Sequence, residues 1–221
     1  MELPDDKNLT EIGMAPRGEG RLLVLACGAI AREVLAVIEA NQLSHVTLQC
    51  LPAILHNRPE EIVPAVEAAV AHAGDKYDQI FLGYGDCGTG GLLKVAAERL
   101  GVTMLPGAHC YAFFEGVSAF SARSEDEFTA FYLTDFLAKQ FDAFVWKPLG
   151  LDRHPELRDM YFGNYDRLVY QAQTDDPELT RLAKDAANRL GLQFERRQTG
   201  YGDLESELVA FSRAPQNEAS P

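Results

Sequence analysis

The sequence has no long apolar run and carries little positive charge. No window approaches the roughly 18 consecutive apolar residues that a membrane-spanning helix needs. The chain holds 20 Lys and Arg residues against 33 Asp and Glu residues, so its formal net charge is -13. Such a charge repels the phosphates of nucleic acids and of anionic membranes. We therefore expect neither a nucleic acid nor a membrane among its partners.

Cysteine is scarce, and the sequence shows no sign of a secretory signal. The N-terminal stretch is polar and acidic, without the basic start and apolar run of such a signal. We therefore expect a cytoplasmic protein in which the 4 cysteines stay reduced. Reduced cysteines favour metal binding or thiol chemistry over disulfides. A chain of 221 residues can also bury enough core to fold without disulfides.

Short apolar runs alternate with longer segments of helical periodicity in the first half of the chain. The runs predict strands at 21–26, 46–52, 79–84 and 102–106, and the segments predict helices at 31–41, 58–73 and 91–101. This alternation predicts an α/β fold with a doubly wound, mostly parallel sheet and helices on both of its faces.

The second half continues the alternation less regularly. It predicts strands at 167–173 and 192–198 and helices at 177–191 and 203–211. We thus expect a sheet of about six strands in a single α/β domain over residues 21–212. A flexible N-terminal arm (1–20) and a flexible tail (213–221) are expected to flank it.

An aromatic-rich segment at 124–141 has the features of a helix. Ser124 and Glu127 have the spacing of a capping box, and Phe128, Phe131 and Phe136 follow at helical spacing. The expected role of this helix is to face the core. A face between two copies of the chain is the alternative, which leaves a homodimer open.

Cysteine and histidine follow the predicted strands of the first half at the points where the strands end. Cys27 comes after the first strand and His56 after the second; Cys87 follows the third, and His109 and Cys110 follow the fourth. Because ligands of open parallel sheets bind beyond the carboxyl ends of the strands, these side chains are expected to converge. Three thiolates suit zinc or another thiophilic metal ion.

The remaining cysteine has a different setting. Cys50 lies inside a predicted strand, on the same face as Val46 and Leu48, so we expect it to be a core residue. The spacing of the other three cysteines matches no standard zinc motif. The metal prediction therefore depends on the strands lying where we expect them.

The loop YGDCGTGG also allows two other interpretations. Gly85, Gly88 and Gly90 precede a helix, whose N-terminus attracts anions, so residues 83–91 could hold a nucleotide or another anion. The glycine spacing matches neither common phosphate-binding fingerprint. A redox thiol is the other alternative, because helix N-termini lower thiol pKa values and Cys27 and Cys87 each precede a predicted helix. There is no C-x-x-C pair to support it.

Four segments in order, LACGAI, LPAILHNRPEEI, YGDCGTGG and LPGAHCYAFFEG, resemble the family called domain of unknown function 1638. The resemblance spans roughly residues 22–211. Its pattern is matched by Cys27 with Gly28, by the Leu-His-Asn that contains His56, by Cys87 and by Cys110. His109 has the weakest correspondence to the family pattern.

The resemblance implies a companion of corrinoid-dependent methyl transfer, because genes of this family often accompany trimethylamine-type methyltransferases and corrinoid proteins. It implies one-carbon metabolism, namely the demethylation of methylated amines such as betaines, with a small-molecule substrate and a corrinoid protein as a partner. A non-catalytic accessory protein, which binds the corrinoid protein or delivers a metal or cofactor, is the alternative that this context leaves open.

A metal-dependent methyltransferase is compatible with these residues. A zinc ion held by several thiolates can keep an incoming thiol as a nucleophilic thiolate. Under this hypothesis Cys27, Cys87, Cys110 and His109 hold the metal. His56 either completes the metal's ligand shell or acts as a hydrogen-bond donor or base, which would make it the catalytic residue.

Overall fold

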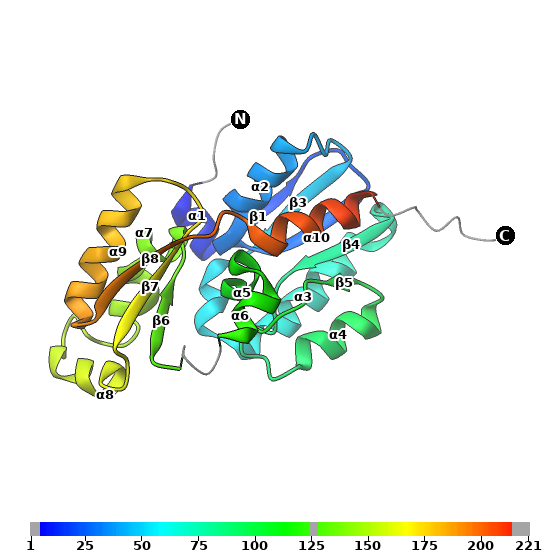
Figure 1. Ribbon diagram of the computed structural model, residues 1–221. Helices are drawn as coiled ribbons and strands as arrows, with labels where there is room; N and C mark the ends of the chain where they lie inside the picture. Colours follow the sequence, from blue (N-terminus) through cyan, green and yellow to red (C-terminus); the bar gives the residue numbers. More distant parts are fainter. Residues whose placement is uncertain (1–4, 124–127, 214–221) are drawn as a thin grey trace. The chain divides into compact units, whose positions relative to one another are not determined.

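The computed structural model describes residues 5–123 and 128–213, and its strands form two sheets (Figure 1). The larger sheet has the order β1 (Met14–Arg17), β3 (Val46–Leu51), β2 (Leu22–Cys27), β4 (Gln79–Gly83) and β5 (Thr103–Met104). The smaller has the order β6 (Ala130–Leu133), β7 (Arg167–Ala172) and β8 (Gln193–Gln198). Only the β1–β3 pair is antiparallel among the described strands. The α/β class with mostly parallel strands is confirmed, but the strands are divided between two sheets.

Helices follow most of the strands. They are α1 (Asp6–Glu11), α2 (Ala31–Ala40), α3 (Pro59–Ala73), α4 (Leu92–Leu100), α5 (Cys110–Glu115), α6 (Val117–Ala122), α7 (Asp135–Lys139), α8 (Arg158–Phe162), α9 (Pro177–Leu190) and α10 (Gly202–Arg213). Short 3-10 turns include η1 (Gly28–Ile30) and η2 (Ala53–Asn57). Over the described ranges, no helix has the length and apolar character needed to cross a membrane.

The chain divides into two compact units. The first comprises residues 1–110 and 203–221 and contains the larger sheet, and the second comprises residues 111–202 and contains the smaller one. The first unit has helices on both faces of its sheet. Leu82 of β4 packs against α3 and α4, whereas its neighbour Phe81 contacts Phe211 of α10, with ring centroids 4.9 Å apart. This alternation follows from the two-residue repeat of a strand.

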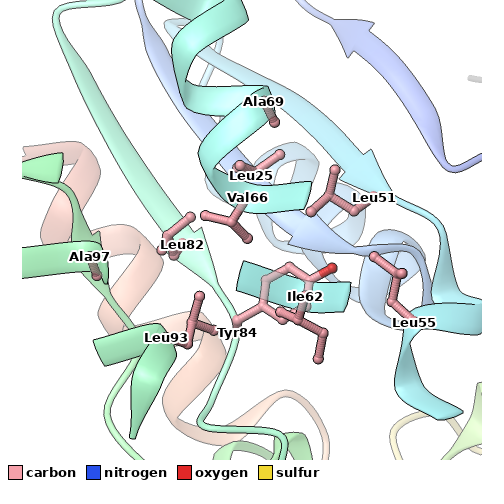
Figure 2. Close-up of a cluster of buried hydrophobic side chains, with 10 residues drawn as sticks. All are labelled: Leu25, Leu51, Leu55, Ile62, Val66, Ala69, Leu82, Tyr84, Leu93 and Ala97. Atoms are coloured by element: carbon pink, nitrogen blue, oxygen red, sulfur yellow. The ribbon is translucent and has the colours of Figure 1, made fainter. Parts of the chain in front are cut away.

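The main core of the first unit lies between the sheet and the helices α3 and α4 (Figure 2). Leu25 of β2 and Leu82 meet Ile62 and Val66 of α3 and Leu93 of α4, and all five are 0 or 1 % exposed. Each buried aliphatic side chain of this kind contributes about 1.5–3 kcal/mol to folding. This packing fixes the strand ends that carry the candidate site.

Residues 5–20, which we expected to belong to a flexible arm, form α1 and β1. Leu9 of α1 is 1 % exposed, and β1 pairs with β3 through the registers Met14 to Cys50 and Arg17 to Leu48. This stretch is mostly polar, so its composition did not indicate that its one leucine is buried. Residues 214–221 of the expected tail lie outside the described residues.

The prediction of a helix over 124–141 is wrong, because residues 130–133 form strand β6. Tyr132 packs with Val169 of β7. Phe131 packs edge-on against Phe162, with ring centroids 5.2 Å apart. A strand that is buried on both faces reads as an apolar run, which does not distinguish it from a helix. The helix begins later, where the Thr134 hydroxyl accepts a hydrogen bond from the Leu137 N–H and caps α7. The expected capping box at Ser124 lies outside the described residues.

A buried carboxylate joins the ends of β6 and β7 in the second unit. Asp135 accepts hydrogen bonds from the Tyr170 hydroxyl at 2.7 Å, from the Gln173 N–H at 3.1 Å, and from the Thr174 N–H and hydroxyl at 2.9 and 2.6 Å. Burial, and then the Asp135 carboxylate, raise the pKa of Tyr170. The Asp135 carboxylate therefore fixes the end of β6 to the end of β7.

Candidate functional site

The candidate site lies at the carboxyl ends of β2, β3, β4 and β5 in the first unit. Cys27 is the last residue of β2, and its sulfur accepts a hydrogen bond from the Ala29 N–H at 3.5 Å, which caps η1. The chain turns at Gly28, where a side-chain carbon would clash with the Leu9 carbonyl oxygen of α1. A glycine directly after the cysteine therefore allows this tight packing.

The loops that follow β4 and β5 are hydrogen-bonded to each other. The Asp86 N–H donates to the Gly107 carbonyl at 3.1 Å, and the Cys87 N–H donates to the Ala108 carbonyl at 2.9 Å. These bonds continue the pairing of β4 with β5 beyond the strands. They bring Cys87 next to the segment that carries His109 and Cys110.

The Asp86 side chain accepts the hydrogen bonds that the glycine loop offers. Its carboxylate accepts from the Gly91 N–H at 2.6 Å, from the Gly90 N–H at 3.1 Å and from the Thr89 hydroxyl at 2.8 Å. Burial alone would raise the pKa of Asp86, but these donors and the Gly88 N–H outweigh it, so the pKa is lowered. A phosphate entering this loop would have to displace the carboxylate.

Cys87 has a left-handed backbone conformation, with φ of 49°. This conformation is uncommon for a residue with a side chain and costs of order 1 kcal/mol or more. Its thiol lies close to the backbone N–H groups of Gly85 and Cys110, which favour the thiolate. The contact with the Cys110 N–H links the third and fourth strand ends directly.

Cys27 and Cys87 lie close to each other and to Tyr84, which directly follows β4. Burial raises the pKa of Cys27 to about 11 and that of Cys87 to about 12, and for Cys87 the neighbouring Cys27 adds to the effect. The Tyr84 side chain is 2 % exposed and belongs to the cluster in Figure 2. Its hydroxyl has no well-aligned hydrogen bond, and it interacts with the Cys27 thiol. Burial therefore outweighs the backbone N–H groups that lower these thiol pKa values, contrary to the redox interpretation.

Cys50 is a core residue, as predicted, with 3 % exposure within β3. Burial, and then Cys27, raise its pKa. Glu33 in the first turn of α2 is 7 % exposed and interacts with both cysteines. Sequence reasoning missed Glu33 and Tyr84. An acidic residue within the otherwise apolar stretch after Cys27, and a tyrosine directly before the glycine loop, were the available signals.

The two histidines form a second group at the same edge. His56 lies in η2 after β3, and His109 lies directly before α5. Desolvation lowers the pKa of His56, and His109 lowers it further. Desolvation also lowers the pKa of His109, and Asp86 partly offsets this. Both rings are therefore neutral at pH 7, the form that binds metals.

The predicted residues gather at one edge without forming a ready-made coordination group. The structure brings Cys27 to Cys87, the Cys110 amide to the Cys87 sulfur, and His56 to His109. Across residues 5–123 and 128–213, however, no three His, Cys, Asp or Glu side chains are arranged to hold a metal ion. All four cysteines are thiols rather than disulfides.

Comparison with known families matches residues 50–208 to the family described as "Protein of unknown function (DUF1638)". This match covers more than half of the chain, which therefore belongs to the family. It includes His56, Cys87 and Cys110, whereas Cys27 precedes it. A search of curated proteins finds no match to this chain.

Proposed function

Because this family's description states no function, we propose one from the site itself: the chain binds a thiophilic metal ion, zinc first, through Cys27, Cys87 and Cys110. The observation that carries the proposal is that the thiols of Cys27 and Cys87, from separate strand ends, lie close together beside the backbone of Cys110. Cys27 and Cys87 interact across neighbouring strands, and Cys110 touches the Cys87 sulfur through its amide. Three sulfur donors and neutral imidazoles are the donor set that zinc prefers.

Binding requires a local rearrangement, since the thiol groups do not yet surround a common point. Cys110 is half-buried at the first position of α5 and His109 is exposed just before it, so the loop after β5 is the part that has to turn. The buried thiols also have to lose their protons, because their pKa values are raised. Metal binding should therefore release protons and strengthen as the pH rises.

We further propose that this site acts in one-carbon metabolism, as a metal-dependent methyltransferase linked to corrinoid-dependent demethylation of methylated amines. This part depends on the family resemblance and on the site's chemistry together. A thiolate-bound zinc would supply a position at which an incoming thiol stays deprotonated and nucleophilic. His56, neutral at pH 7 and beside His109, is suited to accept a proton from that thiol.

The test is metal analysis by mass spectrometry on untagged protein purified without oxygen. We expect close to one zinc or similar ion per chain, and loss of most of it in Cys27→Ala, Cys87→Ala and Cys110→Ala. Cys50→Ala is the matched control, because this buried cysteine is expected to pack rather than bind. It should retain the metal, while circular dichroism shows that all four variants fold.

Two results would contradict the proposal. One is a wild-type protein that takes up no metal even after reconstitution with zinc, and the other is full retention by all three site variants. Turnover with purified methyl donors then separates an enzyme from the accessory alternative. The nucleotide alternative has less support, because Asp86 already accepts the loop's hydrogen bonds.

A further inference from the structure

A groove lies on the first unit between α4 and the segment 102–108 that follows it. Its volume is about 700 Å³, which is within the range of small-molecule sites. The apolar part of its wall comes from Ala97, Val102, Met104, Leu105 and Pro106. No cysteine lines it, and Asp86 and Ala108 of its wall adjoin Cys87 and His109 in the sequence.

Two side chains of opposite charge, Lys94 and Glu98, line the groove from the same face of α4. Residues four apart on a helix are neighbours and often pair, as Arg181 and Asp185 do on α9 at 2.6 Å. Lys94 and Glu98 do not pair with each other, and neither side chain has a hydrogen-bond or ion-pair partner within the described part of the chain. The remaining charged lining residue, Asp86, is already bonded to the glycine loop.

The groove is therefore bipolar along the axis of α4. Lys94 lies near the N-terminal end, where the helix dipole is positive, and Glu98 lies near the C-terminal end, where it is negative. Four residues of helix rise about 6 Å, which is the spacing of the Lys94 and Glu98 Cα atoms along the axis. The apolar wall faces the space between them.

We propose that this groove binds a small zwitterion, an amino acid whose carboxylate and ammonium groups are separated by an apolar chain. The carboxylate pairs with Lys94, the ammonium group pairs with Glu98, and the chain lies against Val102 and Met104. An amino acid without an apolar chain, such as glycine, would leave the apolar wall uncovered. A ligand with a single charge would form an ion pair with only one of Lys94 and Glu98. Residues 105–108 of the groove belong to the loop after β5, so the test of this proposal is made on the metal-free protein.

The experiment uses ε-aminocaproate as the probe and the backbone amide resonances of the full chain as the readout, with a chelator present. We expect saturable shifts confined to α4 and residues 102–108. Caproate and hexylamine, which keep the chain but carry one charge each, should bind about two- to fivefold more weakly, as expected for the loss of one exposed ion pair. Glycine, which lacks the apolar chain, should bind more weakly than ε-aminocaproate.

Variants at both ends of the groove complete the test. Lys94→Gln and Glu98→Gln should each weaken binding of ε-aminocaproate about two- to fivefold. Lys184→Gln on α9, in the second unit, is the matched control and should change nothing. Loss in only one of the two groove variants, or equal binding of caproate or hexylamine, would overturn the zwitterion assignment. Absence of shifts at α4 would overturn the site itself, whatever the metal analysis shows.

Discussion

The substitution Asp86→Asn tests how the glycine loop is held. The Asp86 carboxylate accepts from the Gly91 N–H at 2.6 Å, from the Gly90 N–H at 3.1 Å and from the Thr89 hydroxyl at 2.8 Å. Asparagine keeps one acceptor oxygen, which can still receive two of these bonds. Its amide group replaces the other oxygen and cannot accept from Gly90.

The expected cost has two parts. One lost hydrogen bond to a partly exposed group costs about 1 kcal/mol, and a lost negative charge at the start of α4 costs about 0.3–1 kcal/mol. Solvent screening keeps the sum at the lower end, so we expect Asp86→Asn to lower the free energy of unfolding by about 1–2 kcal/mol. For a chain of this size that corresponds to a Tm lower by about 2–8 °C.

The assay is urea unfolding followed by circular dichroism, together with hydrogen exchange of the loop amides. The Gly90 N–H should exchange faster in Asp86→Asn, because it loses its acceptor. Asp75→Asn, on an exposed turn of the same unit, is the control and should leave both measurements unchanged. If the two variants behave alike, the carboxylate does not hold the loop, and the argument against an anion in this loop is refuted.

Three further predictions concern packing and pH. Leu93→Ala removes a side chain with 0 % exposure and should cost about 2–5 kcal/mol in urea unfolding, whereas Leu92→Ala, at 65 % exposure, should change stability by less than about 0.5 kcal/mol. Tyr84→Phe deletes a buried hydroxyl without a well-aligned hydrogen bond, so it should be neutral or stabilising by up to about 1 kcal/mol; a clear loss would show that its contact with the Cys27 thiol is strong. Tyr170→Phe should lower stability at neutral pH by about 1.5–3 kcal/mol, because a bond to a buried carboxylate is lost. Since the folded pKa of Tyr170 is raised, stability that is complete below the unfolded pKa of 10.0 falls as the pH rises past it; this alkaline loss should be smaller in Tyr170→Phe, and an identical loss would contradict the assignment.

The elements of the first unit follow closely from local patterns in the sequence. Apolar runs located β2, β3 and β4, and helical periodicity located α2, α3 and α4. The second unit shows where this fails: the apolar residues of β6 fit a helix as well as a strand, and only packing against Val169 and Phe162 decides between them. Likewise, no local signal shows that β6, β7 and β8 pair only with one another.

The sequence by itself determined which thiols and imidazoles lie at the carboxyl edge of the larger sheet, because each lies at the end of a strand or in the segment after it, and parallel strands end on the same side. It also determined that Cys50, inside β3, would be buried. Only the tertiary structure decided that Cys27 meets Cys87 beside Tyr84 and Glu33, and that Asp86 occupies the glycine loop. Desolvation by neighbouring segments outweighs the backbone N–H groups that favour the thiolates, so the pKa values of Cys27 and Cys87 are raised. Desolvation of a thiol depends on all the segments packed around it, so it cannot be read from the short stretch of sequence that carries the thiol.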